Sequence, residues 1–153
     1  GLDNMLRSYL IEEHSVAELE DAFIAQTNWD LRKGRPTVVP CAEALENKIY
    51  SDKFHKGFTG TAGGFYGPQG RVVRLNIQDP QLNSKMDAFN YNGTRMTNLE
   101  METSAIYGLG KLLGHNCLSL NAIIANRAVG EFSSKPEETV NELIAYTLDK
   151  LIK

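Results

Sequence analysis

An aromatic ring, an amide and a guanidinium lie close together in a glycine-rich stretch at residues 65–71, which reads FYGPQGR. The ring of Phe65 offers a flat face for stacking on a planar base or a sugar. Gln69 provides one acceptor and two donors, and Arg71 provides a fork of donors. Such a set matches the edge of a pyrimidine ring, which presents carbonyl oxygens and one N–H group. Taken alone, the same composition also fits a surface loop with a solvated arginine.

Two carboxylates flank Met101 at the start of the clearest amphipathic segment of the chain, residues 100–113. If this segment is a helix, Glu100 and Glu102 lie about 200° apart around its axis, so they cannot both face water when one side is covered. A carboxylate turned toward a cleft can accept two hydrogen bonds from vicinal hydroxyls, such as those of a ribose. The alternative is that both carboxylates only stabilise the positive end of the helix dipole.

Asn126 and Arg127 directly follow a mostly apolar run at residues 117–125. A short run of this kind predicts a strand that is covered on both faces. Polar groups at the carboxyl end of such a strand lie where α/β sheets usually bind ligands. We therefore expect Asn126 and Arg127 to contribute to a site, with an ordinary surface loop as the alternative.

The elements that must position these side chains alternate between short strands and helices. Apolar periodicity and breaker residues predict helices at 14–26, 42–50, 82–89 and 100–113, and another after residue 134. Short β-type runs occur at 37–39, 54–62, 72–77 and 117–125. Strands that alternate with helices predict an α/β layered fold, in which helices flank a central mixed or parallel β-sheet.

Histidine and glycine patterns give no support for a metal site or a nucleotide-binding loop. His14, His55 and His115 have no ligand-like spacing to one another or to a cysteine, so no metal site is expected. The glycine-rich residues 60–64 lack the Lys-Ser/Thr pair of a P-loop. A phosphate cradle is therefore not predicted there.

Composition gives no indication of a nucleic-acid partner, a membrane span or a signal peptide. The formal net charge is −3 and no basic run stands out, so a nucleic-acid partner is not expected. No apolar stretch reaches the roughly 20 residues that cross a membrane, and residues 1–8 lack the apolar block of a signal peptide. Cys41 and Cys117 are far apart in the sequence, which indicates two reduced cysteines in a cytoplasmic protein.

Three segments together resemble the nucleoside phosphorylase family and, within it, the uridine phosphorylases. They are FYGPQGR at 65–71, NLEME at 98–102 and IANR at 124–127. The segments occur in the family's order and spacing, and the likeness runs through the final helix. The resemblance implies the nucleoside phosphorylase fold and a pentosyltransferase that cleaves uridine with phosphate to uracil and ribose 1-phosphate, as in pyrimidine nucleoside salvage and catabolism.

The resemblance also implies a role for each matching residue. On the base side, Phe65 packs near the base and sugar, Gln69 and Arg71 hydrogen-bond the uracil edge, and Arg127 acts as a second base-side arginine. The sugar side consists of Glu102, which takes the ribose hydroxyls, and of two residues that line the same site, Glu100 and Met101. Gln69, Arg71 and Glu102 are the residues expected to carry catalysis.

Asn126 favours a pyrimidine substrate within this family. Relatives that cleave purine nucleosides place an aspartate near this strand end, where it protonates N7 of the leaving purine. Uracil has no N7 and leaves with negative charge spread over its ring and carbonyl oxygens. Fixed donors are then more useful than an acid, and each preorganised donor is commonly worth about 3 kcal/mol.

Family members are about twice as long as this chain, and their first half supplies the phosphate-binding turn and arginines. The resemblance therefore implies that residues 1–153 form the C-terminal half of a single nucleoside phosphorylase domain. We expect this chain alone to bind nucleoside poorly and not to turn it over, unless a second polypeptide or a longer protein completes it. No cofactor is expected beyond inorganic phosphate as co-substrate, and homo-oligomers are expected from the resemblance.

Two other functions remain open on the sequence. One is a purine nucleoside phosphorylase or a hydrolytic nucleosidase, which Asn126 disfavours. The other is a non-catalytic nucleoside-binding domain built on the same fold. Among pyrimidine nucleosides, the sequence does not rank uridine against thymidine or deoxyuridine.

Overall fold

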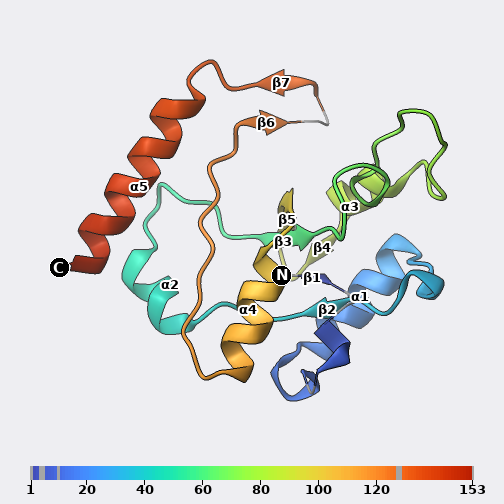
Figure 1. The fold of residues 1–153 in the computed structure, drawn as a ribbon, viewed down its shortest axis with the longest axis horizontal. Coiled ribbons are helices and arrows are strands. Elements are labelled where there is room, and N and C mark those ends of the chain that lie inside the picture. Colours follow the sequence, from blue (N-terminus) through green and yellow to red (C-terminus); the bar gives the residue numbers. More distant parts are fainter. Residues whose placement is uncertain (1, 4–5, 10, 127–128, 153) are drawn as a thin grey trace.

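A mixed β-sheet lies at the centre of the computed structural model, which describes residues 2–3, 6–9, 11–126 and 129–152 (Figure 1). Its five strands have the order β2-β1-β3-β5-β4. They are β1 (Leu2–Asp3), β2 (Thr37–Val38), β3 (Phe58–Thr61), β4 (Asn90–Tyr91) and β5 (Thr94–Glu100). The pairs β1–β3 and β3–β5 are parallel, whereas β1–β2 and β4–β5 are antiparallel. The expected α/β class with a central mixed sheet flanked by helices is confirmed.

Five α-helices occur in the described part of the chain. They are α1 (Ala17–Thr27), α2 (Glu43–Ile49), α3 (Leu82–Ala88), α4 (Thr103–Leu112) and α5 (Pro136–Ile152). Each helix predicted from the sequence is present, with its ends shifted by a few residues. The shift with the largest consequence is at α4, which begins at Thr103 and not at Glu100.

Helices α1 and α3 pack against the sheet through an aromatic cluster. Phe23 of α1 and Phe89 after α3 are fully buried, with their ring centroids 5.1 Å apart in an edge-to-face arrangement. Leu82 and Met86 of α3 complete the buried set, and the β3 residue Phe58 packs beside it. Burial of large apolar side chains supplies most of the favourable free energy of such a layer.

A second buried cluster joins α4 to the first residues of the chain. It consists of Leu6, Ile11, Val39 and Tyr107. The hydroxyl of Tyr107 accepts a hydrogen bond of 2.8 Å from the backbone N–H of Ser119. Helix α4 is therefore fixed by apolar packing on one side and by this polar contact on the other.

The hairpin of β4 and β5 turns at Asn92 and Gly93. Both residues have positive φ, 52° and 84°, as a type I′ turn requires. The turn sets the register that pairs Tyr91 with Thr94. After this turn, β5 runs parallel to β3, and the two strands end side by side at Thr61 and Glu100.

Two predicted strands are absent from the structure. Residues 72–77 have no regular structure, with bends at residues 73–75, and Val72, Val73 and Leu75 are exposed. Residues 117–124 run without regular structure beside α4, and Ile123 and Ile124 are about half exposed. Both predictions were wrong because a strand requires a neighbour for its backbone hydrogen bonds, and no described strand pairs with either segment.

The C-terminal elements lie away from the central sheet (Figure 1). A hairpin of β6 (Ala125–Asn126) and β7 (Glu131–Phe132) precedes α5, which packs on α2. The Tyr146 hydroxyl donates to the carbonyl of Ile49 at 2.9 Å, which anchors α5 there. Four apolar residues of this helix remain 39–52% exposed: Val140, Ile144, Leu148 and Leu151. Among the described residues, no helix combines the length and the apolar character that crossing a bilayer requires.

Candidate functional site

The first two polar segments follow the carboxyl ends of neighbouring parallel strands. Thr61, the last residue of β3, pairs with Glu100, the last residue of β5. The glycine-rich loop that carries residues 65–71 leaves β3, and the turn that carries Met101 and Glu102 leaves β5. Because ligands of α/β proteins bind beyond the carboxyl ends of parallel strands, this edge is the candidate site.

The glycine-rich loop is closed by a 3₁₀ turn at Gly67–Gln69. The carbonyl of Tyr66 accepts hydrogen bonds of 3.0 Å from the backbone N–H groups of both Gln69 and Arg71. Gly70 ends the turn with φ of 73°, a left-handed conformation that costs glycine least. The sharp reversal returns Arg71 to the start of the loop.

Phe65, Gln69 and Arg71 form one contiguous cluster. The Arg71 guanidinium carbon lies 3.4 Å from the ring centroid of Phe65, a cation–π arrangement. One Arg71 nitrogen donates to the backbone carbonyl of Phe65 and, at 3.3 Å, to Oε1 of Gln69. Gln69 is only 2% exposed, whereas Phe65 is half exposed. In this structure the guanidinium therefore covers one face of the ring that was expected to meet the base.

The sequence predicted that Glu100 lies in the first turn of a helix. In the structure it is instead the last residue of β5. One oxygen of its carboxylate accepts a hydrogen bond from the Thr61 hydroxyl. The other accepts backbone N–H donors from Glu102 at 2.7 Å and from Thr103 at 2.6 Å. Burial alone raises the pKa of Glu100, but these donors outweigh it and hold the pKa below the ordinary glutamate value.

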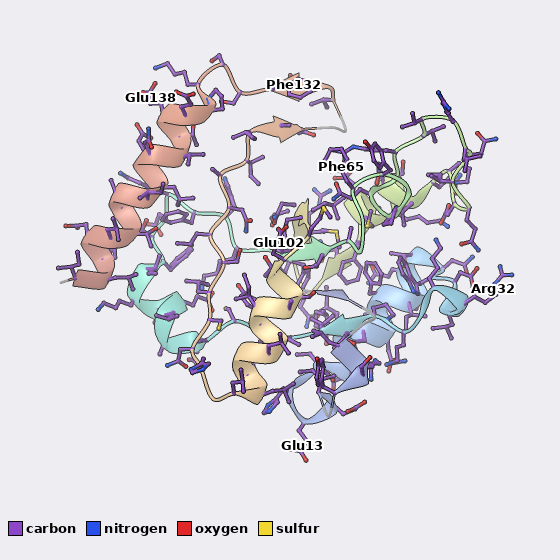
Figure 2. The ribbon with its side chains drawn as sticks, viewed as in Figure 1. Glu13, Arg32, Phe65, Glu102, Phe132 and Glu138 are labelled. Carbon is purple, nitrogen blue, oxygen red and sulfur yellow. The ribbon has the colours of Figure 1, made fainter. Side chains whose placement is uncertain are left out.

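Glu102 is the exposed carboxylate of the turn. It precedes α4 in a non-helical conformation, so the predicted 200° separation of two helical carboxylates does not apply. Among the described residues, its carboxylate accepts one long 3.3 Å contact from the Met101 backbone N–H, and no cation pairs with it. Figure 2 shows Glu102 where α4 meets the end of β5, and Phe65 on the loop that leaves β3. Oxygen acceptors of Glu102 are thus open to hydroxyl donors.

A cavity of about 830 Å³ lies between the glycine-rich loop and the sheet. Arg71 and Tyr66 line it from the loop, and Thr61 lines it from the end of β3. Glu102 is not among the residues of this wall. Thr61, which hydrogen-bonds Glu100, is therefore the residue that connects the cavity to the carboxylate turn.

The third polar segment is not brought to this edge. Asn126 is exposed and belongs to the β6–β7 hairpin, because the strand predicted before it does not form. Arg127 lies outside the described residues. The structure thus unites Phe65, Gln69 and Arg71, and places Glu100, Met101 and Glu102 in a second group beside them.

Metal-binding side chains do not gather in the described part of the chain. No group of three or more His, Cys, Asp or Glu residues there has the geometry to hold a metal ion.

Thr61 is the residue of this site that the sequence reasoning missed. It is the last polar residue before the glycine-rich loop, and such positions at strand ends are where binding groups gather in α/β folds. Its position directly before the glycine-rich loop could therefore have identified Thr61 from the sequence. Its hydrogen bonds to the next strand and to α4 depend on the pairing of β3 with β5, which a local pattern does not reveal.

Glu100→Gln lowers the free energy of unfolding by about 1–2 kcal/mol at pH 7, the range of a lost helix cap. The amide offers one oxygen to the donors that two carboxylate oxygens now satisfy. Because the folded pKa of Glu100 is depressed, its contribution is complete above the ordinary value of 4.5 and is lost as pH falls through the folded pKa. Urea unfolding at a series of pH values measures both effects.

The matched control is Glu43→Gln, which also replaces a carboxylate near the start of a helix, here in the first turn of α2 and at an exposed position. It is expected to cost less than about 0.5 kcal/mol. A Glu100→Gln variant that lost no more stability than Glu43→Gln at every pH would contradict the capping role.

This chain matches no protein-family model and no curated protein sequence at a significant level. Among solved structures it is similar to a nucleoside phosphorylase from Trypanosoma brucei that shows uridine phosphorylase activity. The TM-score is 0.80 at 22% sequence identity, and the match covers 98% of this chain and 54% of that chain. This chain thus spans about half the length of the structure that it matches. At this identity the likeness concerns the fold, and over the matched residues the chain has the fold of a nucleoside phosphorylase.

Proposed function

We propose that this chain supplies the base and ribose site of a uridine phosphorylase. The observation that carries the proposal is the placement of its two polar groups at the carboxyl ends of adjacent parallel strands, β3 and β5. One group is rich in donors and the other holds an exposed carboxylate. The likeness in fold to a nucleoside phosphorylase with uridine phosphorylase activity supports the same assignment.

Gln69 and Arg71 bind the edge of uracil in this proposal. Phosphorolysis breaks the bond between C1′ and N1 of uridine, and its electron pair moves onto the uracil ring and the two carbonyl oxygens. Donors held in place before the reaction stabilise that charge without reorganising. The cluster with Phe65 preorganises Arg71 in this way, through a ring contact and a backbone hydrogen bond.

Glu102 binds the 2′- and 3′-hydroxyls of the ribose. Its carboxylate is exposed, and a carboxylate accepts hydrogen bonds from two hydroxyls at once. Fixing the sugar aligns C1′, which gains oxocarbenium character, with the phosphate oxygen that attacks it. Met101 contributes apolar contact beside the sugar.

Phosphate is bound by polypeptide equivalent to the portion of the solved nucleoside phosphorylase that this chain does not match. The proposal therefore treats residues 1–153 as the C-terminal half of a single catalytic domain. Inorganic phosphate is the co-substrate and no other cofactor takes part. A homo-oligomeric assembly and a cytoplasmic location belong to the same proposal and rest on the resemblance to the family.

The test measures uracil release from uridine by this chain, alone and mixed with the phosphate-binding half of a uridine phosphorylase. Release that requires phosphate and yields ribose 1-phosphate supports the proposal. Equal release without phosphate indicates a hydrolytic nucleosidase, and faster cleavage of inosine indicates a purine phosphorylase. Uridine binding without turnover at any phosphate concentration indicates a binding domain.

A further inference from the structure

One hydroxyl joins three elements at the candidate site. Oγ1 of Thr61, at the end of β3, donates a hydrogen bond to the carboxylate of Glu100, at the end of β5. The same oxygen accepts the backbone N–H of Ser104 in the first turn of α4 at 2.9 Å. The ends of two strands and the start of a helix therefore meet at a single side chain.

The start of α4 is capped from the strands. A helix leaves its first N–H groups without partners in the helix itself, and Glu102, at the N-cap position, caps none of them with its own side chain. Glu100 accepts the N–H groups of Glu102 and Thr103, and Thr61 accepts that of Ser104. The backbone on either side of the Glu102 side chain is thereby held by the pair of Thr61 and Glu100.

The two carboxylates of the turn have different tasks as a result. Both oxygens of Glu100 are occupied by protein donors, so Glu100 has little capacity left for a ligand. Glu102 keeps an exposed carboxylate on a backbone whose N–H is fixed. The backbone around Glu102 is held by the hydrogen bonds of Glu100 and Thr61. Of these two residues, Thr61 is the one that belongs to β3.

We infer that Thr61 is a positioning residue that acts through Glu100 to aim the Glu102 carboxylate, and so sets the preference for a ribose over a 2′-deoxyribose. The inference rests on the proposed function for the identity of the substrate. The contact geometry on which it depends belongs to the chain itself. Thr61 lines the cavity together with Arg71, but its hydroxyl is already engaged by Glu100 and by the N–H of Ser104, so its effect on the sugar is exerted through Glu100.

Three variants separate the hydroxyl from the side chain that carries it. Thr61→Val keeps the branched shape and removes the hydroxyl, and Thr61→Ser keeps the hydroxyl. Thr59→Val is the matched control, because Thr59 also lies on β3 and its hydroxyl donates to Oδ1 of Asn98 at 2.9 Å, away from α4.

Amide hydrogen exchange in this chain tests the contact without any assay of activity. Thr61→Val is expected to speed exchange at the amides of Glu102, Thr103 and Ser104 by about 10-fold, the effect of one lost hydrogen bond. Thr61→Ser should stay within about twofold of the unmodified chain, and Thr59→Val should leave these three amides unchanged. Unaltered protection in Thr61→Val would overturn the inference, whether or not the chain cleaves nucleosides.

Substrate preference in the protein completed with a phosphate-binding half tests the consequence. Thr61→Val is expected to lower kcat/KM for uridine about 10-fold and for 2′-deoxyuridine by much less, and Thr61→Ser should restore the preference. An equal loss for both substrates would assign Thr61 a purely structural role and overturn the inference. Failure of the unmodified protein to cleave uridine would contradict the proposed function, and hydrogen exchange would then decide the positioning role separately.

Discussion

Replacing Arg71 with alanine lowers kcat/KM for uridine phosphorolysis by about 100- to 1,000-fold, as expected when a preorganised donor to a developing oxyanion is removed. Arg71 has a planar fork of donors, and the ring and carbonyl of Phe65 hold that fork in one orientation. Because the leaving uracil gains negative charge, the loss falls mainly on kcat. Initial rates of uracil release at several uridine concentrations separate kcat from KM.

Two further substitutions test whether the orientation of the fork matters as much as its charge. Arg71→Lys keeps the cation but loses the planar donors and the stacking, so it should recover little of the lost rate. Gln69→Ala should cost about 10- to 100-fold, because it removes a donor to uracil together with the acceptor that orients Arg71.

The control for these variants is Arg32→Ala. The Arg32 side chain is 84% exposed and, within the described part of the chain, pairs with Asp30. Figure 2 shows it directed outward, away from Phe65 and Glu102. Its removal should leave uridine cleavage within about twofold, as for surface substitutions in general. The base-reading assignment fails if Arg71→Ala and Gln69→Ala both cleave uridine as fast as Arg32→Ala does.

Local patterns predicted most helices because an amphipathic stripe is a property of the segment alone. The start of α4 was wrong for a reason that lies outside its own sequence. Glu100 and Glu102 resemble the acidic first turn of a helix, but pairing with Thr61 extends β5 through Glu100. A contact between Thr61 and Glu100, which are 39 positions apart, decides where β5 ends and α4 begins. The local sequence around Glu100 does not contain that information.

The strands were mispredicted in two ways: one predicted strand does not form, and one hairpin that does form was not predicted. Residues 117–124 are apolar enough for a buried strand, yet none of the described strands pairs with them, and the N–H of Ser119 bonds to a tyrosine hydroxyl. In contrast, Asn92-Gly93 is a strong local hairpin signal that was overlooked, although it sets the register of β4 and β5. Turn chemistry was thus readable from the sequence, whereas the choice of strand partners was not.

The site was predictable to the extent that its members are neighbours in the chain. Phe65, Gln69 and Arg71 converge because one 3₁₀ turn folds seven residues back on themselves. Asn126 was assigned by assuming a strand before it, and the assignment to this edge loses its basis without that strand. The functional residues that sequence alone identifies best are therefore those that share a loop.

Replacing Glu20 with alanine lowers the free energy of unfolding by about 3–5 kcal/mol, as expected when one partner of a buried ionic network is removed. Glu20 lies in α1 and is 1% exposed. Its carboxylate pairs with Arg7 and, at 3.2 Å, with Arg35, and it accepts the backbone N–H of Val38 at 3.1 Å. Without it, the N–H of Val38 in β2 loses its acceptor, and Arg7 and Arg35 keep the more exposed carboxylates of Glu12 and Asp21.

Asp21→Ala is the matched control, because the adjacent carboxylate also pairs with Arg35, at 2.6 Å, but is 67% exposed. An exposed pair of this kind contributes less than about 1 kcal/mol, so chemical unfolding of the two variants should separate clearly. A loss in Glu20→Ala no larger than in Asp21→Ala would mean that burial adds nothing to the network. The large loss is expected because water can solvate Arg35 after the loss of Asp21, whereas it reaches the N–H of Val38 only if α1 separates from β2.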